Sequence, residues 1–247
     1  MTEVSIITKS ELLEKCGIIH GFSQRTGGVS KSPVDSLNTK KSPLVPDSIE
    51  NVAINIKRIM KDFPSVDNGV LLYLEGGDNV VKIEDCAGFK TLYGYDGAVT
   101  DQKDCFLAVT VADCLPILLV DASAEVIGIS HAGWKGSAGK ITTKVIEQML
   151  ELGAKPANIE AVIGPGICGD CYEVDEEISK QFSSDVTEKR QNGKYLLNIV
   201  KANMIELRGA GVSEIEVIDI CTYENTNKFF SARKEVETGR FLAYISR

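Results

Sequence analysis

The sequence predicts a mixed fold of strands and helices, either α+β or layered α/β, built as one domain. Segments with helical periodicity are interspersed with apolar segments typical of strands, and several strands follow one another directly. That order excludes a simple doubly wound sheet, in which strands and helices would alternate throughout. No internal repeat or Pro/Gly/Ser-rich linker divides residues 1–247, so we predict a single domain over the whole chain.

Prolines, glycines and a capping serine delimit the elements of the first third of the chain. Residues 31–46 carry three prolines among polar residues and predict an ordered irregular loop. Ser48 can cap a helix that ends before Pro64. The apolar residues of that helix at helical spacing are Ile49, Val52, Ile56, Ile59 and Phe63. Strands at 70–73 and 80–83 flank Gly76-Gly77-Asp78-Asn79, a pattern typical of a β-hairpin.

The remaining elements continue the mixture of strands and helices. Further strands are predicted at 106–111, 117–120, 126–130, 159–163 and 215–220. Helices are predicted at 141–152, near 175–182 and at 199–207.

Composition limits the classes of function. The chain has 27 Lys plus Arg against 35 Asp plus Glu, a formal charge of −8, and is 43% hydrophobic, which is typical of a globular protein that folds without disulfides or metals. The acidic balance, without any basic run, argues against binding to nucleic acid or to an anionic membrane. The first residues lack a signal-peptide pattern, and Asp113 and Pro116 interrupt the longest apolar stretch, so we predict a cytoplasmic protein without a membrane span.

Seven cysteines without framework spacing predict core thiols together with one reactive thiol. Cys168 and Cys171 form a C-x-x-C that could be half a zinc site or a redox pair. No second pair has that spacing, so we interpret them as ordinary thiols in a turn. The overlapping segment 164–169 matches G-x-G-x-x-G, but Asp170 and Glu173 follow it and no βαβ unit surrounds it, so a tight turn is favoured over a nucleotide loop.

We predict a candidate reaction centre at the ends of neighbouring predicted strands. Cys114 lies at a strand-to-strand turn, and His131 ends the strand at 126–130. Gly133 and Gly136 follow His131 at the start of a helix, where backbone N–H groups favour an anion and Lys135 adds positive charge. Taken singly, the cysteine and the histidine are better interpreted as core residues. The glycine-rich loop beside them favours a reaction centre.

Ordered motifs along nearly the whole chain resemble the YfiH/YlmD family, the laccase-domain or "polyphenol oxidase" proteins. They are His20-Gly21-Phe22-Ser23-Gln24-Arg25-Thr26-Gly27-Gly28-Val29-Ser30, Ser36-Leu37-Asn38, Ala112-Asp113-Cys114-Leu115-Pro116, His131-Ala132-Gly133-Trp134-Lys135-Gly136, Gly164-Pro165-Gly166-Ile167, Cys171-Tyr172-Glu173-Val174, Cys221-Thr222-Tyr223, Phe229-Phe230-Ser231 and Thr238-Gly239-Arg240. The resemblance implies a single-domain α/β/β/α sandwich. It also implies a purine nucleoside enzyme that phosphorolyses adenosine, inosine, guanosine or methylthioadenosine and deaminates adenosine.

The resemblance further implies a zinc-type centre at Cys114 and His131, with copper as the less favoured metal and no metal as a further possibility. In the family, a histidine of a Gln-x-His-Gly segment supplies the third ligand, but Gly76 occupies that position here. Glu75 and Asp78 are the candidate substitutes. Two histidines in all, His20 and His131, exclude a three-histidine site and make copper oxidase chemistry the least favoured function.

Within these motifs, we predict that a nucleoside and phosphate are bound by Arg25, Asn38, Lys135, Arg233 and Arg240. Two alternatives stay open at this point. One is a metal-free hydrolase in which Cys114 is the nucleophile and His131 the base. The other is a degenerate member that binds a nucleoside or a partner without turnover.

Overall fold

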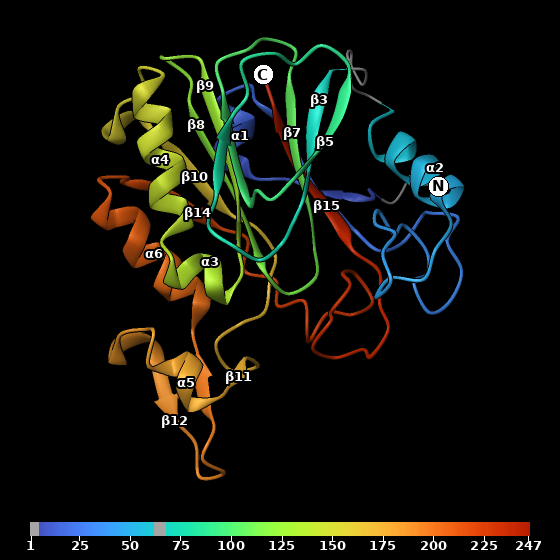
Figure 1. Ribbon diagram of the computed structural model, residues 1–247, viewed down its shortest axis with the longest axis vertical. Coiled ribbons are helices and arrows are strands. Elements are labelled where there is room, and N and C mark those ends of the chain that lie inside the picture. The colour runs from blue at the N-terminus through green and yellow to red at the C-terminus, as the bar shows by residue number, and fades with distance from the viewer. Residues whose placement is uncertain (1–4, 62–67) are drawn as a thin grey trace.

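The computed structural model describes residues 5–61 and 68–247. Two six-stranded sheets lie face to face, and helices cover both outer faces (Figure 1). Helix α2 (Ile49–Ile59) covers one side, and α3 (Trp134–Ala138), α4 (Ile141–Glu151) and α6 (Ile199–Gly209) cover the other. The layered α/β/β/α fold is therefore confirmed. Ser48 caps α2 as predicted, while Phe63 and Pro64 lie outside the described residues.

The first sheet gathers strands from both ends of the chain. In spatial order it contains β1 (Ile7–Thr8), β2 (Ile19–Ser23), β15 (Phe241–Ser246), β7 (Phe106–Val111), β3 (Gly69–Tyr73) and β5 (Phe89–Tyr93). Strand β15 pairs antiparallel with both β2 and β7, whereas β3 runs parallel to β7 and β5. The short helix α1 (Glu11–Lys15) links β1 to β2.

The second sheet carries the candidate reaction centre. Its order is β14 (Glu214–Val217), β10 (Glu160–Ile163), β8 (Leu115–Asp121), β9 (Val126–Ala132), β6 (Gly97–Thr100) and β4 (Val80–Lys82). A small third sheet, with β11 (Glu173–Val174), β13 (Tyr195–Leu197), β12 (Thr187–Lys189) and helix α5 (Glu176–Ser179), extends from one end of the molecule (Figure 1). Two 3-10 turns lie at Pro156–Asn158 and Ser184–Val186.

Alternation along β8 explains why both faces of the second sheet are buried. Leu118 and Val120 belong to the core between the two sheets, whereas Ile117 and Leu119 belong to the core under the helices. Successive side chains of a strand point to opposite faces, so a strand covered on both sides is apolar throughout. All seven residues of β8 and of β9 are buried, which gives the ends of these strands a rigid base.

The predicted hairpin at 70–83 is wrong. Strand β3 lies in the first sheet and β4 in the second, and the intervening segment crosses between the sheets. Gly76 and Gly77 lie in this crossing segment. Their N–H groups donate to the Asp96 carboxylate at 3.0 and 2.8 Å. A glycine pair between two apolar runs indicates that the chain changes direction, but it does not determine whether the two strands pair with each other.

The prediction of free thiols is also wrong for one pair of cysteines. The structure joins Cys86 and Cys105 by a disulfide, with their Cα atoms 5.6 Å apart. Both residues are buried beside the core between the sheets. The other five cysteines are free. In the described part of the chain, no helix has the length and apolar character needed to cross a membrane.

Candidate active site

Cys114 and His131 meet at one end of the second sheet. The antiparallel register of β8 and β9 places Leu115 opposite Ala132, so the residues that flank this pair lie side by side. The Cys114 thiol forms a hydrogen bond with His131. A Cβ at Gly133 would lie 3.1 Å from Cys114 Sγ and 3.8 Å from His131 Nε2, so glycine at this position leaves the two groups room to meet.

Asp96 completes the array and was missed by the sequence analysis. His131 Nδ1 lies 2.8 Å from Asp96 Oδ1, and the His131 backbone N–H donates to the Asp96 carbonyl at 2.7 Å. Asp96 is 1% exposed and accepts the two N–H groups of Gly76 and Gly77 as well. The only sequence signal is an acidic residue directly before the apolar strand β6. Cys114, His131 and Asp96 thus form a cysteine–histidine–aspartate array.

The charges of this array follow from its contacts. Burial by itself lowers the pKa of His131, but Cys114 and the hydrogen bond to Asp96 outweigh it and raise that pKa to about 9. Burial likewise opposes ionisation of Asp96, but the hydrogen bonds from His131 and Gly77 hold its pKa below the usual range. His131 is therefore expected to be protonated beside an ionised Asp96 at neutral pH.

A cavity of about 190 Å³ opens beside Cys114. Its walls are Ala112, Asp113, Cys114, Trp134, Ile167, Tyr172, Ile199, Ala232 and Arg233. The Arg233 guanidinium carbon lies 5.0 Å from the centre of the Tyr172 ring. Burial, followed by the nearby Cys114, raises the pKa of Tyr172 to about 12, so its phenol stays neutral. Two aromatic rings and one cation suit a planar, polar ligand.

Asp113 holds the wall of this cavity together. Its backbone has a φ of 77°, in the left-handed region. One carboxylate oxygen accepts the Thr222 hydroxyl and the other the Arg233 N–H, each at 2.6 Å. Its carbonyl accepts the Ile167 N–H at 2.8 Å. Three segments distant in sequence are thereby fixed around Cys114.

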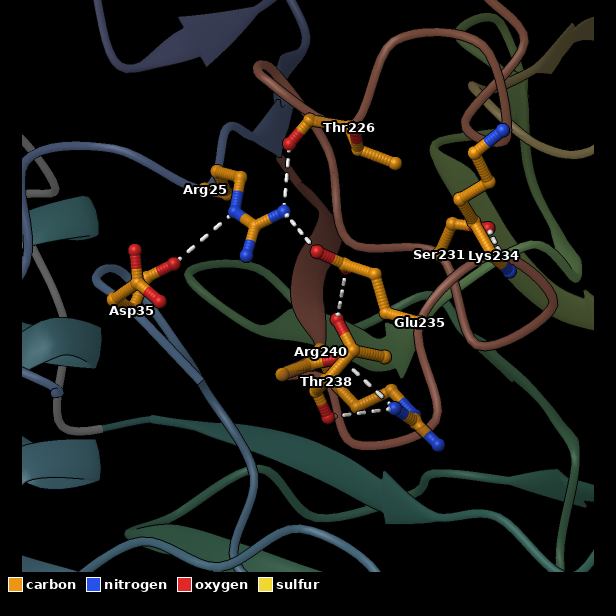
Figure 2. Close-up of polar contacts among 9 residues, drawn as sticks. Arg25, Asp35, Thr226, Ser231, Lys234, Glu235, Thr238 and Arg240 are labelled. Atoms are coloured by element: carbon orange, nitrogen blue, oxygen red, sulfur yellow. Dashed lines mark hydrogen bonds and ion pairs between the residues drawn. The ribbon is translucent and has the colours of Figure 1, made fainter. Parts of the chain in front are cut away.

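Two further cations lie within electrostatic range of the array. Burial lowers the pKa of Arg240, whereas Cys114 and Asp113 oppose that effect. Arg240 donates to the carbonyls of Thr238 and Gly239, as Figure 2 shows. Lys40 was missed by the sequence analysis. Burial and then Arg240 lower its pKa, while the charge of Asp96 opposes this effect, so Lys40 lies within electrostatic range of both groups.

The remaining predicted binding residues have other surroundings. Arg25 is ion-paired with Glu235 at 2.9 Å and also donates to the carbonyls of Asp35 and Thr226 (Figure 2). It thereby ties the 25–47 segment to the 221–240 segment. Its role in phosphate binding stays a prediction.

Asn38 is fully buried, and its amide donates to the Lys40 carbonyl and to Asp47. Its oxygen accepts the Lys40 and Arg240 N–H groups, so it positions both of those cations. Lys135 is exposed, with Nζ 5.5 Å from the Trp134 ring centre. For both residues, direct contact with substrate stays a prediction. His20 is a buried structural residue, because its ring bonds the Ser10 N–H and the Ile18 carbonyl.

A second cluster of ligand-type residues lies behind the cavity. Cys168, Cys171, Cys221 and Glu224 each bring one ligand atom within 4.8 Å of the others, so together they can bind a metal ion. Cys168 and Cys171 are interpreted from the sequence as ordinary turn thiols because no second C-x-x-C offers further metal ligands. The structure supplies those ligands from residues 221 and 224.

Comparison with known proteins identifies the family. The family model described as multi-copper polyphenol oxidoreductase laccase matches residues 19–247. The chain belongs to the YfiH/YlmD family. A purine nucleoside phosphorylase of Deinococcus radiodurans is 38% identical over 231 residues, which cover 92% of this chain and 88% of the relative. An adenosine deaminase from an unknown prokaryotic organism is 36% identical over 166 residues, 63% of each chain. The crystal structure of YlmD from Geobacillus stearothermophilus has a TM-score of 0.89 at 30% identity, covering 100% of this chain and 98% of its own.

Membership of the YfiH/YlmD family implies a metal centre at Cys114 and His131, so we ask whether the surrounding residues can complete it. Cys114 and His131 are together, but among the described residues no third His, Cys, Asp or Glu brings a ligand atom within 4.8 Å of both. Glu75 is exposed, and Asp78 is ion-paired with Lys144 at 2.5 Å. Catalytic zinc generally takes three protein ligands. The residues present therefore do not fit a complete zinc centre at Cys114, and we derive no step through a metal there.

Proposed function

We propose that this YfiH/YlmD family member is a purine nucleoside enzyme whose main reaction is phosphorolysis of the bond between ribose and base. The observation that carries the proposal is the His131–Asp96 hydrogen bond of 2.8 Å beside Cys114, at a cavity whose wall also carries Arg233. The charges of Lys40 and Arg240 act on Asp96 and on Cys114, respectively. The names of the relatives, purine nucleoside phosphorylase and adenosine deaminase, support the substrate class.

The cavity beside Cys114 is the proposed base site. Its volume of about 190 Å³ is below the roughly 300–1,000 Å³ of whole-ligand sites, so it suits the planar base with the ribose at the mouth. Trp134 and Tyr172 can contact the faces of the base. The four candidate substrates differ in the groups that they would present to this cavity. They are adenosine, inosine, guanosine and methylthioadenosine.

The chemistry requires an anion site and a proton source. A phosphate oxygen bonds to C1′ of the ribose while the C1′–N9 bond breaks, and the electron pair of that bond stays on the purine. His131 gives a proton to the departing base, and the acidic proton of hydrogenphosphate then restores it. Lys40 and Arg240, with Arg233 at the cavity wall, hold phosphate and balance its charge. The products are ribose 1-phosphate and the free base.

Deamination of adenosine is the second candidate, favoured by the named deaminase relative. In that reaction a water oxygen bonds to C6 of the purine, the C6–N bond breaks and ammonia leaves. Protonated His131 can give a proton to the departing amine, and the proton that the attacking water releases restores it. A metal-free hydrolase would use the same array differently, with Cys114 as the nucleophile and His131 as its base.

One assay separates these reactions. Purified protein is incubated with inosine or adenosine in the presence and absence of phosphate, and the products are resolved by chromatography. We expect free base only when phosphate is present, and inosine from adenosine in either case. Appearance of neither product at high enzyme concentration, with and without added zinc, would exclude both nucleoside reactions and leave the metal-free hydrolase or a binding protein.

Introducing the missing family ligand should strengthen metal binding. We expect Gly76→His to bind zinc at Cys114 and His131 at least about tenfold more tightly than Gly76→Ala, because a third protein ligand completes the usual set. A Cβ at Gly76 meets no atom within 4 Å, and the Gly76 N–H already bonds Asp96, the partner of His131. Both variants place a side chain at the same left-handed position, where the φ of Gly76 is 73°.

The Gly76 comparison is made by zinc titration in a Cys171→Ser background, which weakens the second cluster. The alanine variant is the matched control for backbone strain, which costs about 1–2 kcal/mol in either case. Equal zinc affinity in both variants would show that residue 76 does not face the Cys114–His131 pair.

A further inference from the structure

The cluster behind the cavity is assembled from two segments far apart in sequence. Cys168 and Cys171 lie between β10 and β11, while Cys221 and Glu224 follow β14. The two segments are joined by backbone pairing, since Gly166 and Cys221 form a parallel bridge and the Thr222 N–H donates to the Gly166 carbonyl at 2.9 Å. The rigid parallel pair of β10 and β14 therefore delivers the ligands to one place.

The spacing of the four ligand atoms is compatible with a metal site. The four ligand atoms, three thiol sulfurs and one carboxylate oxygen, all lie within 4.8 Å of one another. Tetrahedral zinc with Zn–S bonds of about 2.3 Å would place its sulfur ligands about 3.8 Å apart. Closing the cluster onto an ion thus needs shifts of about 1 Å or less. The Cys168 N–H also donates to Cys221 Sγ at 3.3 Å, the kind of bond that stabilises a metal-bound thiolate.

We propose that Cys168, Cys171, Cys221 and Glu224 bind one zinc ion as a structural site, separate from the Cys114–His131 pair. Three soft sulfur ligands and one carboxylate suit zinc better than magnesium or calcium, which prefer oxygen. Cys221 is buried, Cys168 and Cys171 are half-buried, and Glu224 faces solvent, so an ion can enter from the Glu224 side. Burial, followed by the crowded thiols, raises the pKa of Cys171, so zinc must displace protons as it binds.

The ion would clamp the wall of the proposed base site. Ile167 and Tyr172 flank the C-x-x-C on either side, and both line the cavity. Thr222, next to Cys221, donates its hydroxyl to Asp113 at 2.6 Å. Binding of zinc ties these two segments together, so we expect it to order the cavity without touching a substrate. This inference stands on the geometry of the cluster and does not depend on the reaction proposed above.

The test is zinc binding to the reduced full-length protein and three cysteine variants. We expect wild type, Cys114→Ser and the control Cys16→Ser each to bind one zinc ion, as measured by elemental analysis after reconstitution. Cys171→Ser should bind zinc more than about tenfold more weakly, since it loses a direct ligand. Bound zinc should raise the Tm of the first three proteins and leave that of Cys171→Ser unchanged.

Cobalt substitution identifies the ligands independently. Co²⁺ bound at this site should give a thiolate-to-cobalt charge-transfer band that Cys114→Ser retains and Cys171→Ser weakens. Glu224→Ala, a change on the surface, should keep that band but alter the visible bands that report tetrahedral geometry, which makes the test independent of any folding defect in Cys171→Ser. The proposal fails if reduced wild type binds no zinc, if Cys114→Ser loses the ion as readily as Cys171→Ser, or if Cys168 and Cys171 form a disulfide that persists under reducing conditions.

Discussion

Replacing Asp96 by asparagine is expected to lower kcat for phosphorolysis by roughly 10²–10⁴-fold, the range in which positioned proton donors and their orienting carboxylates act. The asparagine oxygen can still accept from His131 and Gly76, but its amide group replaces the oxygen that accepts the Gly77 N–H. More importantly, it removes the negative charge that favours protonated His131. Steady-state kinetics with inosine and phosphate measure the effect.

The pH profile distinguishes this positioning role from simple damage. The pKa of His131 is raised to about 9, so the proton-donating form is fully present at neutral pH and is lost as the pH rises through that value. Loss of the Asp96 charge removes one of the causes, so the falling limb of the profile should move to lower pH in Asp96→Asn. Asp101→Asn, on the exposed loop after β6, is the matched control and should keep wild-type kcat and the wild-type limb. If the falling limb of the pH profile stays in place in Asp96→Asn, His131 is not the proton donor.

Replacing Lys40 by methionine is expected to raise the KM for phosphate by about 10–100-fold, because a charge-assisted hydrogen bond contributes about 1.5–3 kcal/mol. Lys40 is half-buried and within electrostatic range of Arg240 and Asp96. The aliphatic part of methionine keeps contact with the Tyr73 ring, which the Lys40 ammonium approaches to 4.4 Å. Initial rates over a phosphate series give the KM.

The chain offers two controls for this effect. Lys41→Met changes the next residue, whose side chain is exposed, and should leave the KM for phosphate unchanged. Deamination of adenosine uses no phosphate, so its rate in Lys40→Met should stay near wild type. A fall in deamination as large as that in phosphorolysis would mean that Lys40 supports the whole site and does not bind phosphate.

The parts of the site that follow from local patterns could be predicted from the sequence. Cys114 directly precedes the apolar strand β8, and His131 lies at the end of the neighbouring apolar strand β9. The start of one antiparallel strand lies beside the end of the next, so their meeting was foreseeable. Asp96 and Lys40 were missed, because each reaches the site through a contact with a residue distant in sequence. A single aspartate before a strand, or one lysine in a polar loop, has no distinguishing pattern.

The same limit explains the errors in the fold. The apolar runs that became β3, β4, β7, β8, β9, β10 and β14 were located, whereas the other strands, among them β2, β6 and β15 of the two main sheets, were not. Which strands pair is decided by contacts across the sandwich, and the hairpin prediction assumed the nearest neighbour. The cluster of Cys168, Cys171, Cys221 and Glu224 was missed for the same reason, since its second pair of residues is a C-x-x-E that no C-x-x-C search detects. The disulfide of Cys86 and Cys105 likewise joins two loops that sequence spacing does not relate.

The position of β15 determines when the nascent chain can fold. Residues 241–246 form a strand in the middle of the first sheet, between β2 and β7, which are synthesised much earlier. Until β15 leaves the ribosome, β2 and β7 have no partner at those edges, and unpaired edges readily join strands of other chains. The N-terminal and middle parts of the sheet therefore cannot be united before residues 241–246 have been synthesised. Chaperones that shield strand edges would have the greatest effect on the yield of this protein during that interval.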